Sequence, residues 1–354
     1  MAARELTARE AALTPPRAHG TPSARGRLRI EPEDFVVEEL LGFAPAGAGA
    51  HVLLRVRKRN ANTQWVAREL ARLAGCRATE VGYAGLKDRR AVAVQWFSLP
   101  RARAAVNWHD LRGADFEVLE AHPHTRKLPR GALAGNRFAI RIGVHDGDGA
   151  ALASRLAPRL AAIERRGVPN YFGEQRFGRD GGNLRRLEAA SVERLPAQQR
   201  AFALSAARSV IFNGVLAERV SDGTWERLQP GDVANLDGRG SIFPIESVDS
   251  ALTERAARLE IHPTGPLWGQ GSPPSAAGVL ELETAIAARY PDAAAACTAA
   301  RMAQERRSLR LAVHELRCEI EPQSVRVHFR LTRGGFATAV LAELIESQSP
   351  ESST

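Results

Sequence analysis

A single carboxylate stands among cations in the stretch YAGLKDRRAVAVQWF, residues 83–97. Asp88 follows Lys87 and precedes Arg89 and Arg90, in a turn between two short apolar segments typical of strands. Neighbouring cations favour the ionised form of a carboxylate, and an ionised aspartate can attack an electron-poor carbon such as sugar C1′. Because the cations could hold flanking phosphates, the loop suits chemistry on a polynucleotide. The alternative is a plain turn in which the aspartate hydrogen-bonds local backbone.

Two further segments gather residues that suit nucleotide binding. NYFGEQRFG, residues 170–178, contains Tyr171, Gln175 and Arg176, and its aromatic and arginine side chains offer stacking surfaces for unpaired bases. TRGGFAT places Phe336 after two glycines at the start of a predicted helix, where backbone can approach a phosphate or a base. The alternative for NYFGEQRFG is a loop packed by its own side chains. The alternative for Phe336 is an aromatic residue of the hydrophobic core.

The charge of the chain favours a polyanionic partner. Its 354 residues include 49 Lys and Arg against 40 Asp and Glu, a net charge of +9. Cys76, Cys297 and Cys318 are far apart and form no CxxC pair, which argues for a reducing compartment and against a disulfide framework or a cysteine zinc site. His122 and His124 lack a further ligand at suitable spacing, so an ordinary loop is favoured over a metal site.

The sequence predicts a cytoplasmic protein. No run reaches the roughly 20 apolar residues that a membrane helix needs. Residues 1–25 lack the apolar core of a signal peptide and are rich in Ala, Pro, Arg and Thr, which predicts a mobile tail.

Hydrophobic periodicity predicts strand-rich segments on either side of a helical middle. Alternation with period two predicts strands at 51–57, 91–99, 136–142 and 325–331. A helix beginning at Asn62 or Thr63 should end at Gly75, and further helices are expected at about 149–165, 200–220 and 337–345. This pattern indicates an α/β or α+β chain with an insertion.

Nine motifs resemble those of the TruD family of tRNA pseudouridine synthases, in the same order and with similar spacing. The strongest are YAGLKDRRAVAVQWFSLP, PNYFGEQRFGRDGGN and RGGFATAVLAEL, and the others are PEDFVVEELLGF, GAGAH, GNRFAIRI, FNGVLAER, GPLWG and RSLRL. GLKD alone would be weak evidence for this family, but the motifs together are specific for it. The match departs at Ala93, where the family often has Thr.

The resemblance implies roles for four residues. Asp88 is the catalytic carboxylate of an enzyme that isomerises uridine in RNA to pseudouridine without metal or cofactor. Phe35 and Phe336 contact the nucleotide, and Asn136 holds the catalytic loop or the nucleotide. Apolar rings suit a uridine that has left its stack. Lys87, Arg89 and the NYFGEQRFG residues named above are expected to support the site.

The resemblance also implies the architecture and the partner. We expect the pseudouridine synthase α/β fold, with a mixed, largely antiparallel sheet and a family-specific inserted domain. The catalytic domain should comprise residues 26–161 and 307–354, with the insertion at 162–306. The implied substrate is tRNA, at uridine 13, and we expect a monomer.

Two other functions stay open from the residues alone. One is a non-catalytic RNA-binding or tRNA-folding protein on the same scaffold. The other is a nucleoside glycosidase, which usually needs a second carboxylate that is not evident near Asp88. Candidate phosphate contacts are Arg55, Arg57, Lys58, Arg59, Arg126, Lys127, Arg130, Arg165, Arg166, Arg306, Arg307 and Arg310.

Overall fold

The computed structural model describes residues 14–22, 24–101, 106–144, 148–178, 181–189 and 192–348. It divides into two compact units, each described by itself. The sheet unit comprises Ser23–Leu160, Val313–Gly335 and Ile345–Thr354. The second unit comprises Met1–Pro22, Ala161–Ala312 and Phe336–Leu344. The predicted insertion at 162–306 falls inside the central segment of the second unit.

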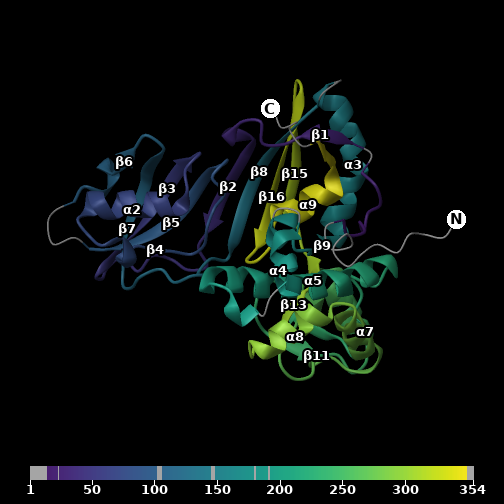
Figure 1. Cartoon of the computed structure of the whole chain (residues 1–354). Coiled ribbons are helices and arrows are strands. Elements are labelled where there is room, and N and C mark those ends of the chain that lie inside the picture. Colours follow the sequence, from purple (N-terminus) through teal and green to yellow (C-terminus); the bar gives the residue numbers. More distant parts are fainter. Residues whose placement is uncertain are drawn as a thin grey trace. The chain divides into compact units, whose positions relative to one another are not determined.

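The sheet unit is built on one 11-stranded sheet, with the strand order β15-β16-β8-β2-β5-β3-β7-β6 and three short strands beside this path (Figure 1). Its pairs β2–β5 and β1–β17 are parallel, and the remaining pairs are antiparallel. The strands are β1 Arg25–Arg27, β2 Phe35–Leu40, β3 His51–Arg59, β4 Gly82–Tyr83, β5 Val92–Pro100, β6 Arg112–Gly113, β7 Phe116–His124, β8 Gly135–Gly143, β15 His314–Glu321, β16 Ser324–Thr332 and β17 Glu346–Gln348.

Strand register places one row of side chains across a single face of this sheet. The row runs from Lys58 in β3 through neighbouring paired residues in β5, β2, β8 and β16, which are Ala93, Val37, Phe138 and Phe329. Because side chains alternate between faces with period two, their neighbours at i ± 2 share this face. We call it the apolar face, since most of its side chains are buried and hydrophobic.

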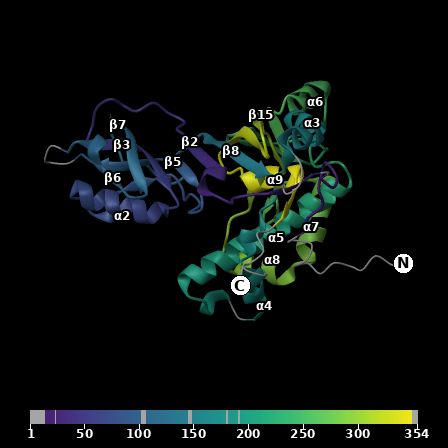
Figure 2. The ribbon, with the colours of Figure 1, turned by 90° about the horizontal axis from the view of Figure 1, so that it is seen from above.

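Helix α2, Thr63–Ala74, covers part of the apolar face. Its Val66 and Leu70 are fully buried in one cluster with Val56 and other strand residues. Figure 2 shows α2 along one side of β3 and β5. The helix ends, as predicted, at Gly75, whose φ of 66° is the left-handed conformation that favours glycine.

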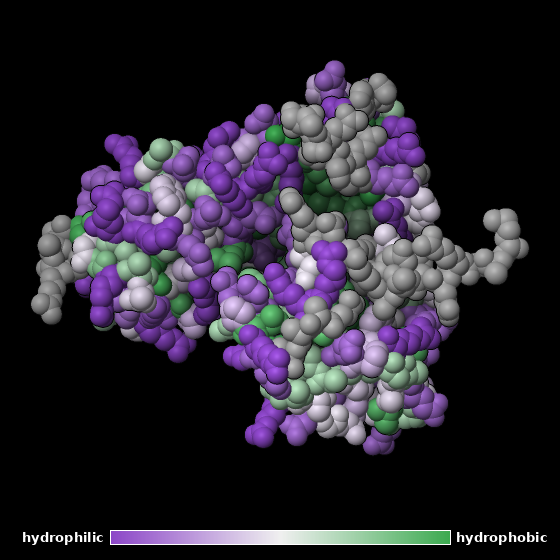
Figure 3. Space-filling view, in the orientation of Figure 1, coloured by the Kyte–Doolittle hydropathy of each residue, from purple (hydrophilic) through white to green (hydrophobic). Residues whose placement is uncertain are grey.

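The opposite face of the sheet carries arginine–glutamate ion pairs. Arg55 Nη2 lies 2.5 Å from Glu38 Oε1, and the same guanidinium also pairs with Glu120. Arg57 and Arg59 pair with glutamates too. Figure 3 shows many hydrophilic residues on the visible surface of this unit. Three predicted phosphate contacts, Arg55, Arg57 and Arg59, are therefore engaged with carboxylates instead.

The second unit contains more strand than predicted. A four-stranded antiparallel sheet, in the order β11-β10-β12-β13, and the pair β14–β9 lie among its helices. Prolines and a glycine in β12 conceal the strand pattern, so the expectation of a helical middle missed this sheet. The elements are α4 Gly182–Ala189, α5 Ala197–Ser221, α6 Ser250–Ala257, α7 Ala277–Ala288, α8 Pro291–Ala299, α9 Ala337–Leu344, β9 Val168–Pro169, β10 Val233–Leu236, β11 Ile242–Pro244, β12 Ile261–Leu267, β13 Glu305–Ser308 and β14 Arg310–Leu311, and α3 Gly149–Arg166 leads into the unit.

Helix α5 forms the centre of the second unit. It is long and apolar enough to cross a membrane, but more than half of its apolar window is buried inside the structure. Its buried residues include the polar Ser209, Asn213 and Arg219. Asn213 exchanges two hydrogen bonds of 2.9 Å with the main chain of Phe172. These contacts identify α5 as a core helix.

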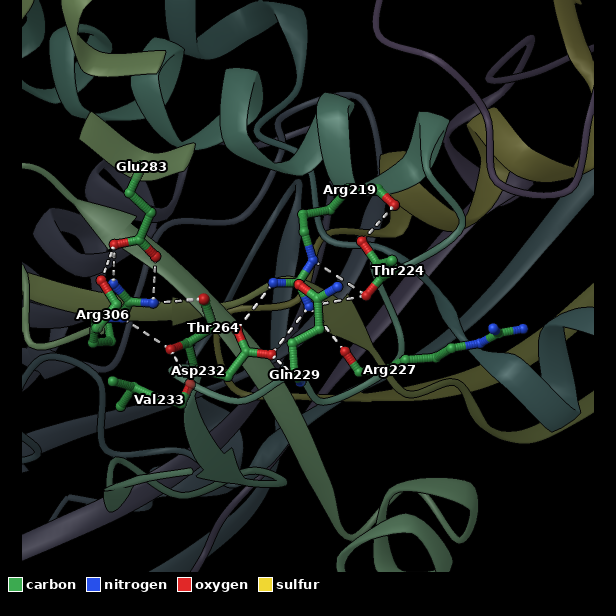
Figure 4. A network of polar contacts seen from close by, with 10 residues as sticks. Arg219, Thr224, Arg227, Gln229, Asp232, Val233, Thr264, Glu283 and Arg306 are labelled. Atoms are coloured by element: carbon green, nitrogen blue, oxygen red, sulfur yellow. Dashed lines mark hydrogen bonds and ion pairs between the residues drawn. The ribbon is translucent and has the colours of Figure 1, made fainter. Parts of the chain in front are cut away.

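Two buried ion pairs hold the second unit together (Figure 4). Arg219 Nη1 lies 3.0 Å from Asp232 Oδ1, and its guanidinium also donates to the carbonyls of Thr224 and Arg227. Arg306 Nη2 lies 2.7 Å from Glu283 Oε1. Because Arg306 and the similarly buried Arg310 are enclosed, the prediction that they contact phosphates is wrong.

Residues 14–22 pack against the second unit, which differs from the expectation of a mobile tail up to residue 25. The Glu343 carboxylate accepts hydrogen bonds from the backbone N–H groups of Ala18 and His19, at 2.9 and 3.1 Å. The His19 ring meets Trp225 edge-on at 6.1 Å. A buried carboxylate requires hydrogen-bond partners of this kind. The amino-acid composition of the segment, on which the prediction of a mobile tail was based, does not indicate these contacts. Residues 1–13 lie outside the described part of the chain.

We expect Asp232→Asn to lower the free energy of unfolding by about 3–5 kcal/mol, because it leaves the buried Arg219 guanidinium without its counter-charge. Urea unfolding measures this. The matched control, Glu254→Gln, breaks an exposed pair with Arg258 and should change the free energy by less than about 1 kcal/mol. Equal effects of the two substitutions would contradict the importance of the buried pair.

Candidate active site

Asp88 lies in an irregular loop, residues 84–91, between β4 and β5. Its side chain is 43% exposed. Asp88 Oδ2 accepts a hydrogen bond of 2.9 Å from Arg29 Nη2, so the carboxylate is neutralised on one side and open to solvent.

Side chains of the apolar face and of α2 fix the main chain of this loop. Lys58 Nζ lies 2.8 Å from the carbonyl oxygen of Asp88, and Gln95 Nε2 lies 2.6 Å from that of Gly85. The backbone N–H of Lys87 donates to Thr63 Oγ1 over 3.0 Å. The Thr63 hydroxyl donates in turn to the Gln95 side chain. The main chain of the loop is thus held at three residues, Gly85, Lys87 and Asp88.

A buried ion pair supplies a fourth anchor. Lys87 Nζ lies 2.6 Å from Glu39 Oε1, and the other oxygen of Glu39 accepts the backbone N–H of Trp96 at 3.0 Å. The Lys87 side chain is only 10% exposed. It therefore holds the loop to β2, whereas the charge pattern suggested a cation available for phosphates.

Two residues of the predicted site, Phe35 and Asn136, share one face because of strand register. Phe35 pairs with Ile140, and Glu39 pairs with Asn136, on the apolar face. Phe35 is buried and meets Phe138 edge-on at 6.1 Å. Asn136 Oδ1 is buried and has no hydrogen-bond partner among the residues that the structure describes. This unpaired acceptor is the feature of Asn136 that suits a ligand, and it makes no bond to the Asp88 loop.

Arg29 is a site residue that sequence reasoning missed. Its Cζ lies 4.3 Å from the centre of the Phe35 ring, so the guanidinium bridges that ring and the Asp88 carboxylate. Its backbone has a φ of 58°, an uncommon conformation for a residue other than glycine. Nothing in the sequence distinguishes this arginine, six residues before Phe35, from an ordinary solvent-exposed cation.

Arg89 stays exposed at the edge of the loop, and so does Arg90. Neither side chain has an ion pair with any of the described residues. They are the cations of the loop that remain free to meet a phosphate.

The predicted residues of NYFGEQRFG lie with Phe336 in the second unit. The Phe336 ring is 39% exposed and lies 6.4 Å from that of Phe172. Arg307 Cζ lies 4.2 Å from the Phe172 centroid and 5.6 Å from that of Phe336. Arg176 lies over Phe172 at 5.0 Å. Aromatic rings and guanidinium groups thus form one stacked cluster.

Burial perturbs the titratable groups of this cluster. It lowers the pKa of Arg307 to about 9, helped by the neighbouring Arg176, so the guanidinium stays charged at neutral pH. Burial raises the pKa of Tyr171, whose hydroxyl finds no hydrogen-bond partner in the described part of the chain. Gln175 lies exposed in a short 3₁₀ helix, Glu174–Phe177. Arg179 and Asp180 of the same motif lie outside the described residues.

No cluster of three or more His, Cys, Asp or Glu that could hold a metal ion occurs among the residues for which the structure gives positions.

Comparison with known proteins identifies the family. The family model "tRNA pseudouridine synthase D (TruD)" matches residues 16–187 and 183–344. A protein of Methylococcus capsulatus named tRNA pseudouridine synthase D is 44% identical over 340 residues, with 94% of each chain covered. One of Pseudomonas aeruginosa with the same name is 44% identical over 339 residues, again with 94% coverage of each chain.

The chain belongs to the TruD family. This confirms the family predicted from the motifs and makes the protein an enzyme of the isomerase class.

A crystal structure of a putative TruD protein from Methanosarcina mazei has the same fold. Its TM-score is 0.74 over 98% of both chains, although only 19% of residues are identical. With the mixed, largely antiparallel sheet described above, it confirms the predicted fold class.

We expect Glu39→Gln to lower the free energy of unfolding by about 3–5 kcal/mol, because it removes the charge that compensates the enclosed Lys87 ammonium. Urea unfolding compares it with Glu117→Gln, which breaks a solvent-exposed pair with Arg57 in the same unit. If Glu39→Gln unfolds at the same urea concentration as Glu117→Gln, the buried pair does not anchor the loop.

Proposed function

We propose that this protein isomerises uridine to pseudouridine in tRNA, at uridine 13, with Asp88 as the nucleophile. The observation that carries the proposal is an exposed carboxylate on a loop whose main chain is fixed, with Arg29 bound to one oxygen. Family membership supports the activity and the tRNA substrate.

The proposed reaction needs no second substrate. An oxygen of Asp88 attacks C1′ of the flipped-out nucleotide, and the C1′–N1 bond breaks with its electron pair leaving on uracil. After uracil turns, C5 attacks C1′ and displaces the carboxylate. The proton on C5 is lost and N1 gains one, so product and substrate have the same composition. Arg29, which donates a hydrogen bond to Asp88 Oδ2, is placed to orient the carboxylate.

Several groups, described unit by unit, are assigned to recognition of the RNA in this proposal. The unpaired Asn136 Oδ1 suits the N3–H donor of uracil, which cytosine lacks. The exposed ring of Phe336, supported by Phe172 and Arg307, offers a stacking surface for a base. Arg89 supplies positive charge for phosphate. Such a protein would act in the cytoplasm, where tRNA is processed, and we propose that it acts as a monomer.

We expect purified wild-type protein to form pseudouridine at position 13 of an unmodified tRNA transcript and Asp88→Asn to form none, because an amide cannot act as the nucleophile. A carbodiimide-dependent reverse-transcription stop maps the product. Asp292→Asn, at an exposed residue in the first turn of α8, is the matched control and should behave as wild type.

A transcript with cytidine at position 13 should give no stop there. If the wild-type protein binds tRNA but produces no reverse-transcription stop at any position, the non-catalytic RNA-binding function is favoured over the enzyme. Full activity of Asp88→Asn would exclude its role as nucleophile.

A further inference from the structure

Lys58 is a buried charge that the proposed reaction does not use. It stands near the end of β3, on the apolar face, and its side chain is fully buried. Its ammonium lies 2.7 Å from the carbonyl oxygen of Ala61 and 2.8 Å from that of Asp88. Its hydrogen-bond acceptors in the structure are thus main-chain carbonyls, one of them belonging to the catalytic aspartate.

Such a burial is costly, since an enclosed ammonium loses several kcal/mol of hydration. A methionine of similar length would fill the same space without that cost. The charge therefore needs a compensating function. The prediction from sequence, an outward cation that contacts phosphate, is wrong because period-two alternation continues from Val56 and directs residue 58 into the core.

Charged groups from two elements face this ammonium. Asp88 and Glu39 stabilise its charge, and Lys87 opposes it. Burial is the largest effect and lowers the pKa of Lys58 to about 8. The ammonium is therefore charged at neutral pH and loses its proton as the pH rises through about 8, well below the ordinary lysine value of about 10.4.

We propose that Lys58 is the positioning residue of the catalytic loop, its ammonium fixing the main chain of Asp88 so that the carboxylate meets C1′. This rests on the proposed role of Asp88. A charge-assisted hydrogen bond is stronger than a neutral one, which explains why an ammonium occupies this position. Lys58 does not itself touch the substrate in this account.

The first test compares Lys58→Met with wild type under single-turnover conditions at saturating tRNA. We expect the rate to fall about 10- to 100-fold, since a misplaced reacting group has effects of this size, while the Kd for tRNA changes less than about twofold. Arg72→Met removes one exposed cation from α2 and should match wild type. A wild-type rate for folded Lys58→Met would overturn the proposal.

Trypsin provides a readout that does not depend on activity. Arg89 and Arg90 are exposed cleavage sites in the loop. Native Lys58→Met should be cut there several-fold faster than wild type or Arg72→Met, with unchanged cleavage elsewhere. Unchanged cleavage at these two sites would also overturn the proposal, even if wild-type protein formed no pseudouridine and the proposed function had failed.

A pH profile keeps the proposal testable if Lys58→Met does not fold. The wild-type rate should fall as the pH rises through about 8, where the ammonium loses its proton. Lys58→Arg stays charged throughout this range, so its profile should lack that fall. Identical profiles of wild type and Lys58→Arg between pH 6.5 and 9 would contradict a role for the charge.

Discussion

The buried polar contacts beneath residues 85–88 are the constraint on which the site depends. Loops are ordinarily the mobile part of a fold, yet here the main chain is bonded to Lys58, Thr63 and Gln95. The Asp88 carboxylate stays open to solvent, with Arg29 beside it. The proposed nucleophile, held in this way, has lost its conformational freedom before substrate binds, which is one source of catalytic power.

The sheet makes these contacts possible through its register. Lys58, Gln95, Glu39 and Asn136 come from four strands, and they share a face only because every pair between those strands is aligned. A shift of one residue would turn any of them to the opposite side. The buried apolar residues of the same face, such as Phe138, fix that register, so the hydrophobic core determines the geometry of the polar site.

Alternation, helix ends and motif order could be predicted from the sequence, and they led to Asp88, the mixed sheet and the family. The role of Arg29 could not be predicted from the sequence, because it depends on a hydrogen bond to Asp88, a residue far along the chain. Lys58 was misjudged although the alternation of Val52, Leu54 and Val56 already indicated that it points inward. The sheet of the second unit was missed because prolines interrupt β12.

Amide hydrogen exchange of the free protein tests most directly whether the loop that carries Asp88 is fixed before RNA binds. The Lys87 N–H is bonded to Thr63 Oγ1, so NMR should find it strongly protected from exchange without RNA. Exchange at the rate of an unstructured peptide, slowed only when tRNA is added, would show that the substrate orders the loop and would contradict the account.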